Sequence, residues 1–106
     1  MIVSVEELKT HLRIQQDEED EYIEGLIKQA QEYAESYCRV SFEQTTTNDE
    51  DEEVPVPVPE PVRLAVMLMA SFYYENREIG DTASWNATRR AFQNLLYPFR
   101  DPDKMF

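Results

Sequence analysis

Residues 60–80 read EPVRLAVMLMASFYYENREIG, and this stretch decides the fold. Pro61 suits the first turn of a helix, because its missing amide proton would have no helical partner there and its φ is already helical. Apolar residues then cover most of the helix circumference. They comprise Val62, Ala65, Val66, Met69, Phe72 and Tyr73 on one face, with Leu64, Met67, Leu68 and Ser71 over much of the rest. A helix that is apolar nearly all round is buried on more than one side, and in a chain of 106 residues we expect the second side to meet another subunit.

Two helices are predicted before this stretch. The first begins at Ser4, where Ser4 and Glu7 have the spacing of a capping box, and it closes near Ile14. The second and longest helix runs from about residue 18 to about residue 39, with Asp17 as the expected N-cap. Gly25 lies within it at a cost of about 1 kcal/mol relative to alanine, and the usual reason for such a glycine is the close approach of another backbone.

Between the second and third helices the character of the sequence changes. The stretch SFEQTTTNDEDEEVPVPVPEP, residues 41–61, contains five consecutive acids at 49–53 and prolines at every second position from 55 to 61. Alternating prolines remove amide donors and favour an extended backbone. We therefore expect an acidic, proline-rich arm over residues 43–60 that is irregular or briefly extended. Short strands around 40–46 and 54–58 are a weaker alternative.

A fourth helix is predicted after the turn GDTAS at residues 80–84, with Ser84 as its cap. Its apolar stripe consists of Trp85, Thr88, Phe92, Leu95, Leu96 and Phe99. Pro98 should disrupt its end, and residues 101–106 should form a flexible tail. The prediction is a single all-α domain over residues 1–106, a small bundle of four helices interrupted by the arm at 43–60.

The charge excludes several kinds of partner. The chain has 10 Lys and Arg against 22 Asp and Glu, which gives a net charge of −12. Such a surface repels nucleic acid and anionic lipid, so we expect protein partners and no membrane. The ten basic residues are scattered, and Arg63, Arg89 and Arg90 are those that helix packing is least expected to use.

The sequence also indicates where the protein is made. It contains one cysteine, it does not begin with a signal-peptide pattern, and it lacks an apolar run long enough to span a bilayer. We therefore expect synthesis in a reducing cytoplasm.

No catalytic, metal or cofactor site is predicted. His11 and Cys38 are the only histidine and the only cysteine, and nothing in the sequence brings them together as a base and a nucleophile. His11 is expected on the surface and Cys38 as a small buried residue. The acids at 49–53 lack the glycine and the alternating spacing of an EF-hand calcium loop. We therefore predict that the chain is not an enzyme.

Two groups of residues are candidates for binding other proteins. The first closes the third helix and consists of Tyr73, Tyr74, Glu75, Asn76 and Arg77, which we predict to form a subunit interface. Tyr73 and Tyr74 point about 100° apart, so the core can take one ring and leave the other facing outward. For Tyr73 and Trp85 a place in the core is the favoured interpretation. The second group lies at the C-terminal end of the chain, where apolar side chains are interspersed with charged ones. It consists of Phe99, Arg100, Met105 and Phe106, which we predict to dock on a partner.

Four stretches in this order resemble the small head–tail connector proteins of tailed bacteriophages, which are also called head-completion or adaptor proteins and are often labelled as DNA-packaging proteins. The stretches are VSVEELKTHLRI, DEEDEYIEGLIKQAQEYAESYCRV, PEPVRLAVMLMASFYYENREIG and AFQNLLYPFR. The third resembles the family's proline-led apolar helix that ends in Tyr-Glu-Asn-Arg. The fourth is similar to its closing leucine pair, proline, aromatic residue and arginine. The resemblance leaves out the arm at about 43–58.

The resemblance implies a protein of the virion, or of a prophage, that is made in the bacterial cytoplasm. It implies a ring of about a dozen helical protomers beneath the capsid portal, which extends the DNA channel towards the tail. Its partners would be other copies of itself, the portal protein and the next tail or stopper component. DNA would pass without being held tightly. The alternative function is an acidic DNA mimic or a regulatory protein-binding module, which the charge alone supports.

Overall fold

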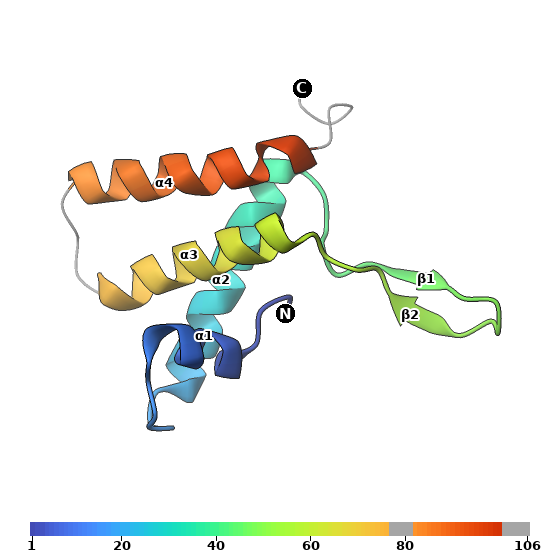
Figure 1. Cartoon of the computed structure of the whole chain (residues 1–106), viewed down its shortest axis with the longest axis horizontal. Coiled ribbons are helices and arrows are strands. Elements are labelled where there is room, and N and C mark those ends of the chain that lie inside the picture. Colours follow the sequence, from blue (N-terminus) through green and yellow to red (C-terminus); the bar gives the residue numbers. More distant parts are fainter. Residues whose placement is uncertain (77–81, 101–106) are drawn as a thin grey trace.

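The computed structural model describes residues 1–76 and 82–100 of the chain, and these residues are mostly helical (Figure 1). The α-helices of this described part are α1 (Val5–Leu12), α2 (Asp20–Cys38), α3 (Glu60–Glu75) and α4 (Thr82–Leu96). It also contains the short strands β1 (Thr45–Thr47) and β2 (Glu53–Pro55) and a 3-10 turn, η1 (Tyr97–Phe99). The all-α prediction, with its four helices in a small bundle, is confirmed.

The first helix begins as the capping box predicted. Ser4 Oγ accepts a hydrogen bond of 3.0 Å from the Glu7 amide, and Glu7 Oε1 accepts one of 3.1 Å from the Ser4 amide. The helix ends at Arg13, whose φ of 60° lies in the left-handed region that closes many helices. The predicted start of α1 is therefore confirmed in its side-chain detail.

The turn from α1 to α2 is held by Lys9. Its Nζ donates to Asp17 Oδ1 at 2.6 Å and to Asp20 Oδ1 at 2.8 Å. These hydrogen bonds, first the one to Asp17, raise the pKa of Lys9, and the same contact lowers the pKa of Asp17. The prediction that Asp17 caps α2 is wrong: α2 starts after Glu19, without a side-chain cap, because the Asp17 carboxylate is engaged by the lysine instead.

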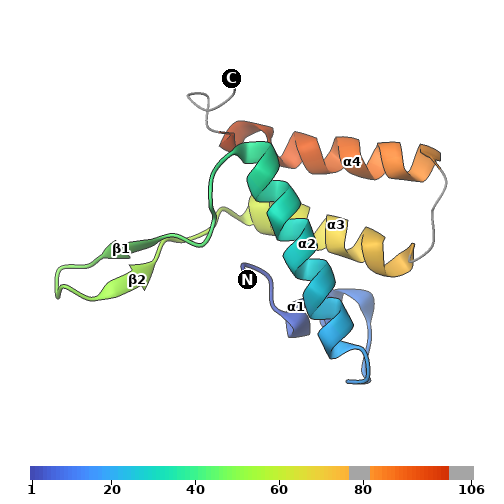
Figure 2. The ribbon, with the colours of Figure 1, turned by 180° about the vertical axis from the view of Figure 1, so that it is seen from behind.

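The core lies where α3 is packed between α2 and α4. Figure 1 shows α3 and α4 side by side, with α2 crossing behind them, and Figure 2 shows the same crossing from the other side. The body is flat, with Cα extents of 47 × 37 × 17 Å. Fully buried apolar residues come from every helix and from the N-terminal segment. They are Val3, Leu8, Ile23, Ile27, Ala30, Ala34, Cys38, Val62, Ala65, Val66, Met69, Ala70, Phe92 and Leu96.

The fourth helix docks through its aromatic residues. Phe92 is fully buried and meets the Tyr33 ring edge-on, with centroids 5.0 Å apart. Trp85 packs against the core, with its ring 5.7 Å from that of Phe72, which confirms its predicted place. The helix starts at Thr82 and not after Ser84, so the predicted cap is wrong. Pro98 ends the α-helix as predicted, since the chain continues as the 3-10 turn η1.

The arm forms a small antiparallel hairpin. The paired residues are Thr45 with Pro55, Thr46 with Val54 and Thr47 with Glu53. The strands therefore lie within or beside the two stretches that the weaker alternative named. Both figures show the hairpin projecting away from the helices along the long direction of the molecule (Figures 1 and 2).

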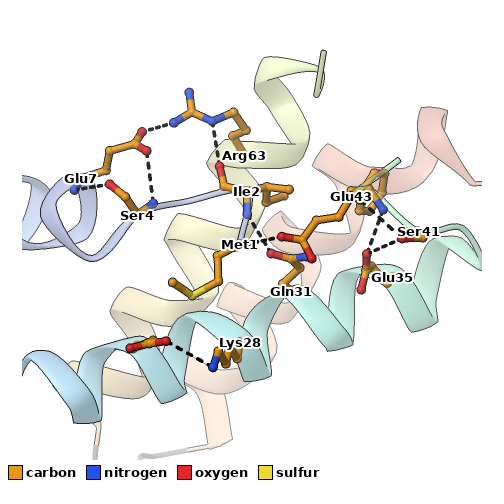
Figure 3. A network of polar contacts seen from close by, with 12 residues as sticks. Met1, Ile2, Ser4, Glu7, Lys28, Gln31, Glu35, Ser41, Glu43 and Arg63 are labelled. Atoms are coloured by element: carbon orange, nitrogen blue, oxygen red, sulfur yellow. Dashed lines mark hydrogen bonds and ion pairs between the residues drawn. The ribbon is translucent and has the colours of Figure 1, made fainter. Parts of the chain in front are cut away.

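A network of polar contacts holds the base of the arm against α2 and the N-terminal segment (Figure 3). Glu35 Oε2 accepts from the Phe42 amide at 2.8 Å and from Ser41 Oγ at 3.3 Å. Next to it, Glu43 pairs with the Met1 ammonium, and this hydrogen bond lowers the pKa of the Glu43 carboxyl. Because several contacts converge there, the arm leaves the body in a defined direction.

Arg63 joins the N-terminal segment to α3 (Figure 3). Its Nε donates to the Ile2 carbonyl at 3.2 Å, and its terminal nitrogens pair with Glu7 and with Glu60. The Ile2 amide donates in turn to Gln31 Oε1 at 2.9 Å. Arg63 is thus used by the fold, contrary to the expectation that packing would leave it available.

Gly25 is exposed on α2, and a Cβ placed on it would meet nothing within 4 Å among the described residues. The expected close approach of another backbone is therefore wrong for the protomer. Gly25→Ala should raise the free energy of unfolding by about 1 kcal/mol, because glycine loses more backbone freedom on folding than alanine. Urea denaturation at low protein concentration measures this change.

Gln29→Ala is the matched control, because Gln29 is exposed on the same helix and is already a good helix former. It should change the stability by about 0.4 kcal/mol or less. A Gly25→Ala variant that is less stable than the unaltered chain would contradict the open space seen at this position.

Candidate assembly surfaces

The two tyrosines at the end of α3 make most of their contacts within the protomer. Tyr73 and Tyr74 are half-buried and pack against the core. Burial raises the pKa of Tyr73, and the neighbouring Tyr33 adds to the shift. Tyr74 Oη donates to Glu19 Oε1 at 3.2 Å, which ties the end of α3 to the start of α2. The favoured place of Tyr73 in the core agrees with these contacts.

The residues that follow differ in their exposure. Glu75 is exposed, whereas Asn76 closes its own helix: its backbone amide and its Nδ2 donate to the Phe72 carbonyl at 2.9 and 3.0 Å. Arg77 lies outside the described residues. The surface that this end of α3 offers to a neighbour therefore consists of Glu75 and the outer part of Tyr74, and the interface itself stays a prediction.

The third helix also carries apolar residues outside its fully buried side. Leu64 is 49% exposed, and Met67 and Leu68 are half-buried. Spacings of three and four residues put these side chains next to one another on the helix surface, and Met67 also packs against the edge of the core. We call Leu64, Met67 and Leu68 the outer stripe of α3. The sequence had predicted such a second apolar side.

The last described residues are attached to the body. Phe99 packs against the core, and Arg100 Nε donates to the Tyr37 carbonyl at 3.1 Å. The guanidinium carbon of Arg100 lies 4.6 Å from the centroid of the Tyr37 ring, within the range of a cation–π contact. Tyr97, by contrast, is 64% exposed. Met105 and Phe106, the other predicted docking residues, lie outside the described part.

The outer face of α4 is a surface that the sequence analysis did not single out. It consists of exposed residues at helical spacing, Ala83, Ala87, Arg90, Ala91 and Asn94. Arg89 is exposed beside it, and neither arginine has an ion-pair partner within residues 1–76 and 82–100. Helical spacing in the sequence could have identified this face, because these positions lie on the side of the helix opposite the predicted apolar stripe of Trp85 and Phe92.

The histidine and the cysteine lie in different surroundings, one on the surface and one in the core. Cys38 is fully buried, its Sγ lies 3.7 Å from the Leu96 carbonyl oxygen, and burial raises its pKa to about 11. His11 is exposed on α1. Within the described part of the chain, no group of three or more His, Cys, Asp or Glu could hold a metal ion. Nor is any helix there long and apolar enough to cross a membrane.

A comparison with protein families agrees with this picture of a helical, partner-binding protomer. The model of the family described as phage gp6-like head-tail connector protein matches residues 2–101, a span that includes the arm. No curated protein and no solved structure matches the chain significantly. Since the family match covers nearly the whole sequence, the chain belongs to the phage gp6-like head–tail connector proteins.

Proposed function

We propose that copies of this chain form a closed ring that docks beneath the capsid portal and continues the DNA channel towards the tail. The connector family supports a structural role in the phage particle and association with portal and tail components. The ring, its size of about a dozen copies and its place in the channel are the proposal. The protein would act by shape and contact, without catalysis.

The observation that carries the ring is the outer stripe of α3. The stability of the protomer alone does not require an apolar residue at Leu64, which is 49% exposed and lies beside the half-buried Met67 and Leu68. An exposed leucine beside two half-buried apolar residues, in a chain with a net charge of −12, favours a site of protein contact. In a ring each protomer uses two different surfaces, because the contact repeats head to tail around the axis.

The end of α3 extends this contact with polar groups. Glu75 and Tyr74 lie at the end of the outer stripe, and Arg77 follows them in sequence. Aromatic and arginine side chains are enriched among the residues that contribute most to interfaces. We assign Tyr73, Tyr74, Glu75, Asn76 and Arg77 to the contact between neighbouring copies, with Tyr73 positioning the helix end from within the core.

The net charge of −12 agrees with a passage for DNA. Carboxylates on the wall of a channel repel phosphates, so DNA moving through it would not be retained. Cations that could grip the duplex are few. Among the described residues Arg63 is paired with Glu7 and Glu60, and Arg100 lies against Tyr37.

Tyr74→Ala combined with Arg77→Glu should weaken assembly by about tenfold or more, because it removes an anchoring ring and reverses a charge at the proposed contact. Light scattering, with and without the portal protein, measures the assembled mass. Tyr22→Ala is the control, since Tyr22 is an exposed tyrosine on α2. Circular dichroism checks that the protomer stays folded. Normal assembly of a folded double variant would remove this end of α3 from the interface.

Deleting residues 101–106 should leave the fold intact and reduce docking on the portal or on the next connector component. The body ends with Phe99 and Arg100 attached to the core, so the deletion removes none of the described contacts. Replacing only Met105 and Phe106 by serine should reproduce most of the loss if the apolar groups are the anchors. Co-sedimentation with the partner measures docking, and full docking by the truncated chain would refute the prediction.

Duplex DNA should be retained weakly or not at all in a gel shift at near-physiological salt. Duplex binding needs several lysine or arginine contacts to phosphate on one face, and acids outnumber bases here by 22 to 10. The assembled ring should be used as well as the free chain, because a ring brings Arg89 and Arg90 of many copies together. Tight retention with a steep salt dependence would show a protein that grips DNA.

A further inference from the structure

The hairpin arm of β1 and β2 has little to stabilise it within the protomer. Every residue of the two strands is exposed except Val54, which is half-buried. A two-stranded hairpin in water is marginally stable unless it packs against a helix or further strands. Its base is fixed by Glu35, so the arm is aimed outward yet has no surface of its own to lie on. A hairpin of this kind indicates a second molecule.

The end of the arm concentrates negative charge. Residues 49–53 are all acidic, and the turn that carries them is organised by Asn48, whose Oδ1 accepts from the Glu50 and Glu52 amides at 2.9 Å each. Asp51 adopts a φ of 61°, the left-handed conformation that such a turn requires. Five carboxylates held close together repel one another, so a partner surface should supply cations.

The outer face of α4 has the complementary properties. Arg90 lies on it and Arg89 beside it, both exposed and without an ion-pair partner in the described protomer. The other members of the face are three alanines and Asn94, whose small side chains leave room for an extended backbone. In a chain with 22 acids, two adjacent arginines without an ion pair to any of the residues 1–76 and 82–100 favour a contact with a partner.

The arm does not lie on the α4 of its own copy. Both views show it projecting beyond the ends of the helices, so that its strands do not lie along α4 (Figures 1 and 2). The arm and the outer face of α4 are therefore two separate surfaces of one protomer. A contact between two different surfaces of neighbouring copies runs head to tail, and such contacts generate a ring when the rotation closes.

We propose that the β1–β2 arm of one copy lies across the outer face of α4 of the next copy, with the acidic residues 49–53 placed against Arg89 and Arg90. This inference rests on the proposed ring and names a contact between its neighbours. Each ion pair at such an exposed site contributes little by itself, so the contact depends on several pairs and on the backbone packed over the alanines. It also orders the hairpin, which gains the helix surface that it lacks alone.

Charge reversal on each side, followed by their combination, tests the contact. The variant Arg89→Glu with Arg90→Glu should assemble about tenfold more weakly than the unaltered chain, and Glu50→Arg with Glu52→Arg should do the same. The chain that carries all four substitutions should recover most of the assembly, because the pairs form again with opposite sign. Lys28→Glu is the control for added negative charge, since Lys28 is exposed on α2 and, within the described residues, forms an ion pair with Glu24 one helical turn away.

The measurement is the assembled mass by light scattering at several salt concentrations, with and without the portal protein. Normal rings from the Arg89→Glu, Arg90→Glu variant, or no recovery in the fourfold variant, would overturn the arm contact and leave the ring standing. A loss of DNA or portal binding from rings that still form would assign the arginines to that partner instead. Absence of any oligomer from the unaltered chain, even with the portal, would overturn the ring as well.

A chemical cross-link gives an independent answer. Mixing a chain that carries Glu52→Cys with one that carries Arg90→Cys should give a disulfide-linked pair of different chains under mild oxidation, whereas Glu52→Cys mixed with Lys28→Cys should give none. The natural Cys38 is buried and stays out of the reaction. Equal cross-linking of both mixtures would contradict the proposed contact.

Discussion

The burial of α3 between α2 and α4 is the packing on which the rest of the structure depends. Val62, Ala65, Val66, Met69 and Ala70 are all fully buried, and several of them are small enough to let the neighbouring helices come close. Most of the apolar stripe of α2 and of α4 is covered by α3, and the two helices touch each other directly through Tyr33 and Phe92. The aromatic contacts of Phe92 and Trp85 depend on the same packing, because they meet Tyr33 on α2 and Phe72 on α3.

A second consequence of this packing is that the arm has a direction. The arm leaves α2 at one end and enters α3 at the other, so the crossing of these two helices fixes both ends of the hairpin. Glu35 holds the outgoing chain, and Arg63 joins the start of α3 to the N-terminal segment. The acidic turn is therefore carried at the end of a braced hairpin. A braced arm loses less conformational freedom on binding than a flexible one, which favours a defined contact with a neighbour.

These features suit the proposed ring, in which each copy would bind its neighbours and other proteins firmly while DNA passes by. The family match supports the structural role, and the distribution of charge explains how both requirements can be met. Acids outnumber basic residues by 22 to 10, while Arg63 and Arg100 are held by contacts within the protomer. The exposed Arg89 and Arg90 and the outer stripe of α3 stand out from that surface as places where a protein partner can bind.

The sequence by itself determined the helices, because helical periodicity and local signals such as the Ser4 and Glu7 capping box and Pro61 act over a few residues. It also identified the core side of α4 and the connector family. Tertiary structure alone decided which charged groups form ion pairs within the protomer. Asp17 pairs with Lys9, which is 8 residues away in the sequence, and Arg63 pairs with Glu7, which is 56 residues away. It likewise decided that Tyr74 hydrogen-bonds to Glu19, whereas the sequence had already indicated that helix packing would not use Arg89 and Arg90. Long-range pairing depends on how the helices cross, and a linear pattern of residues does not contain that angle.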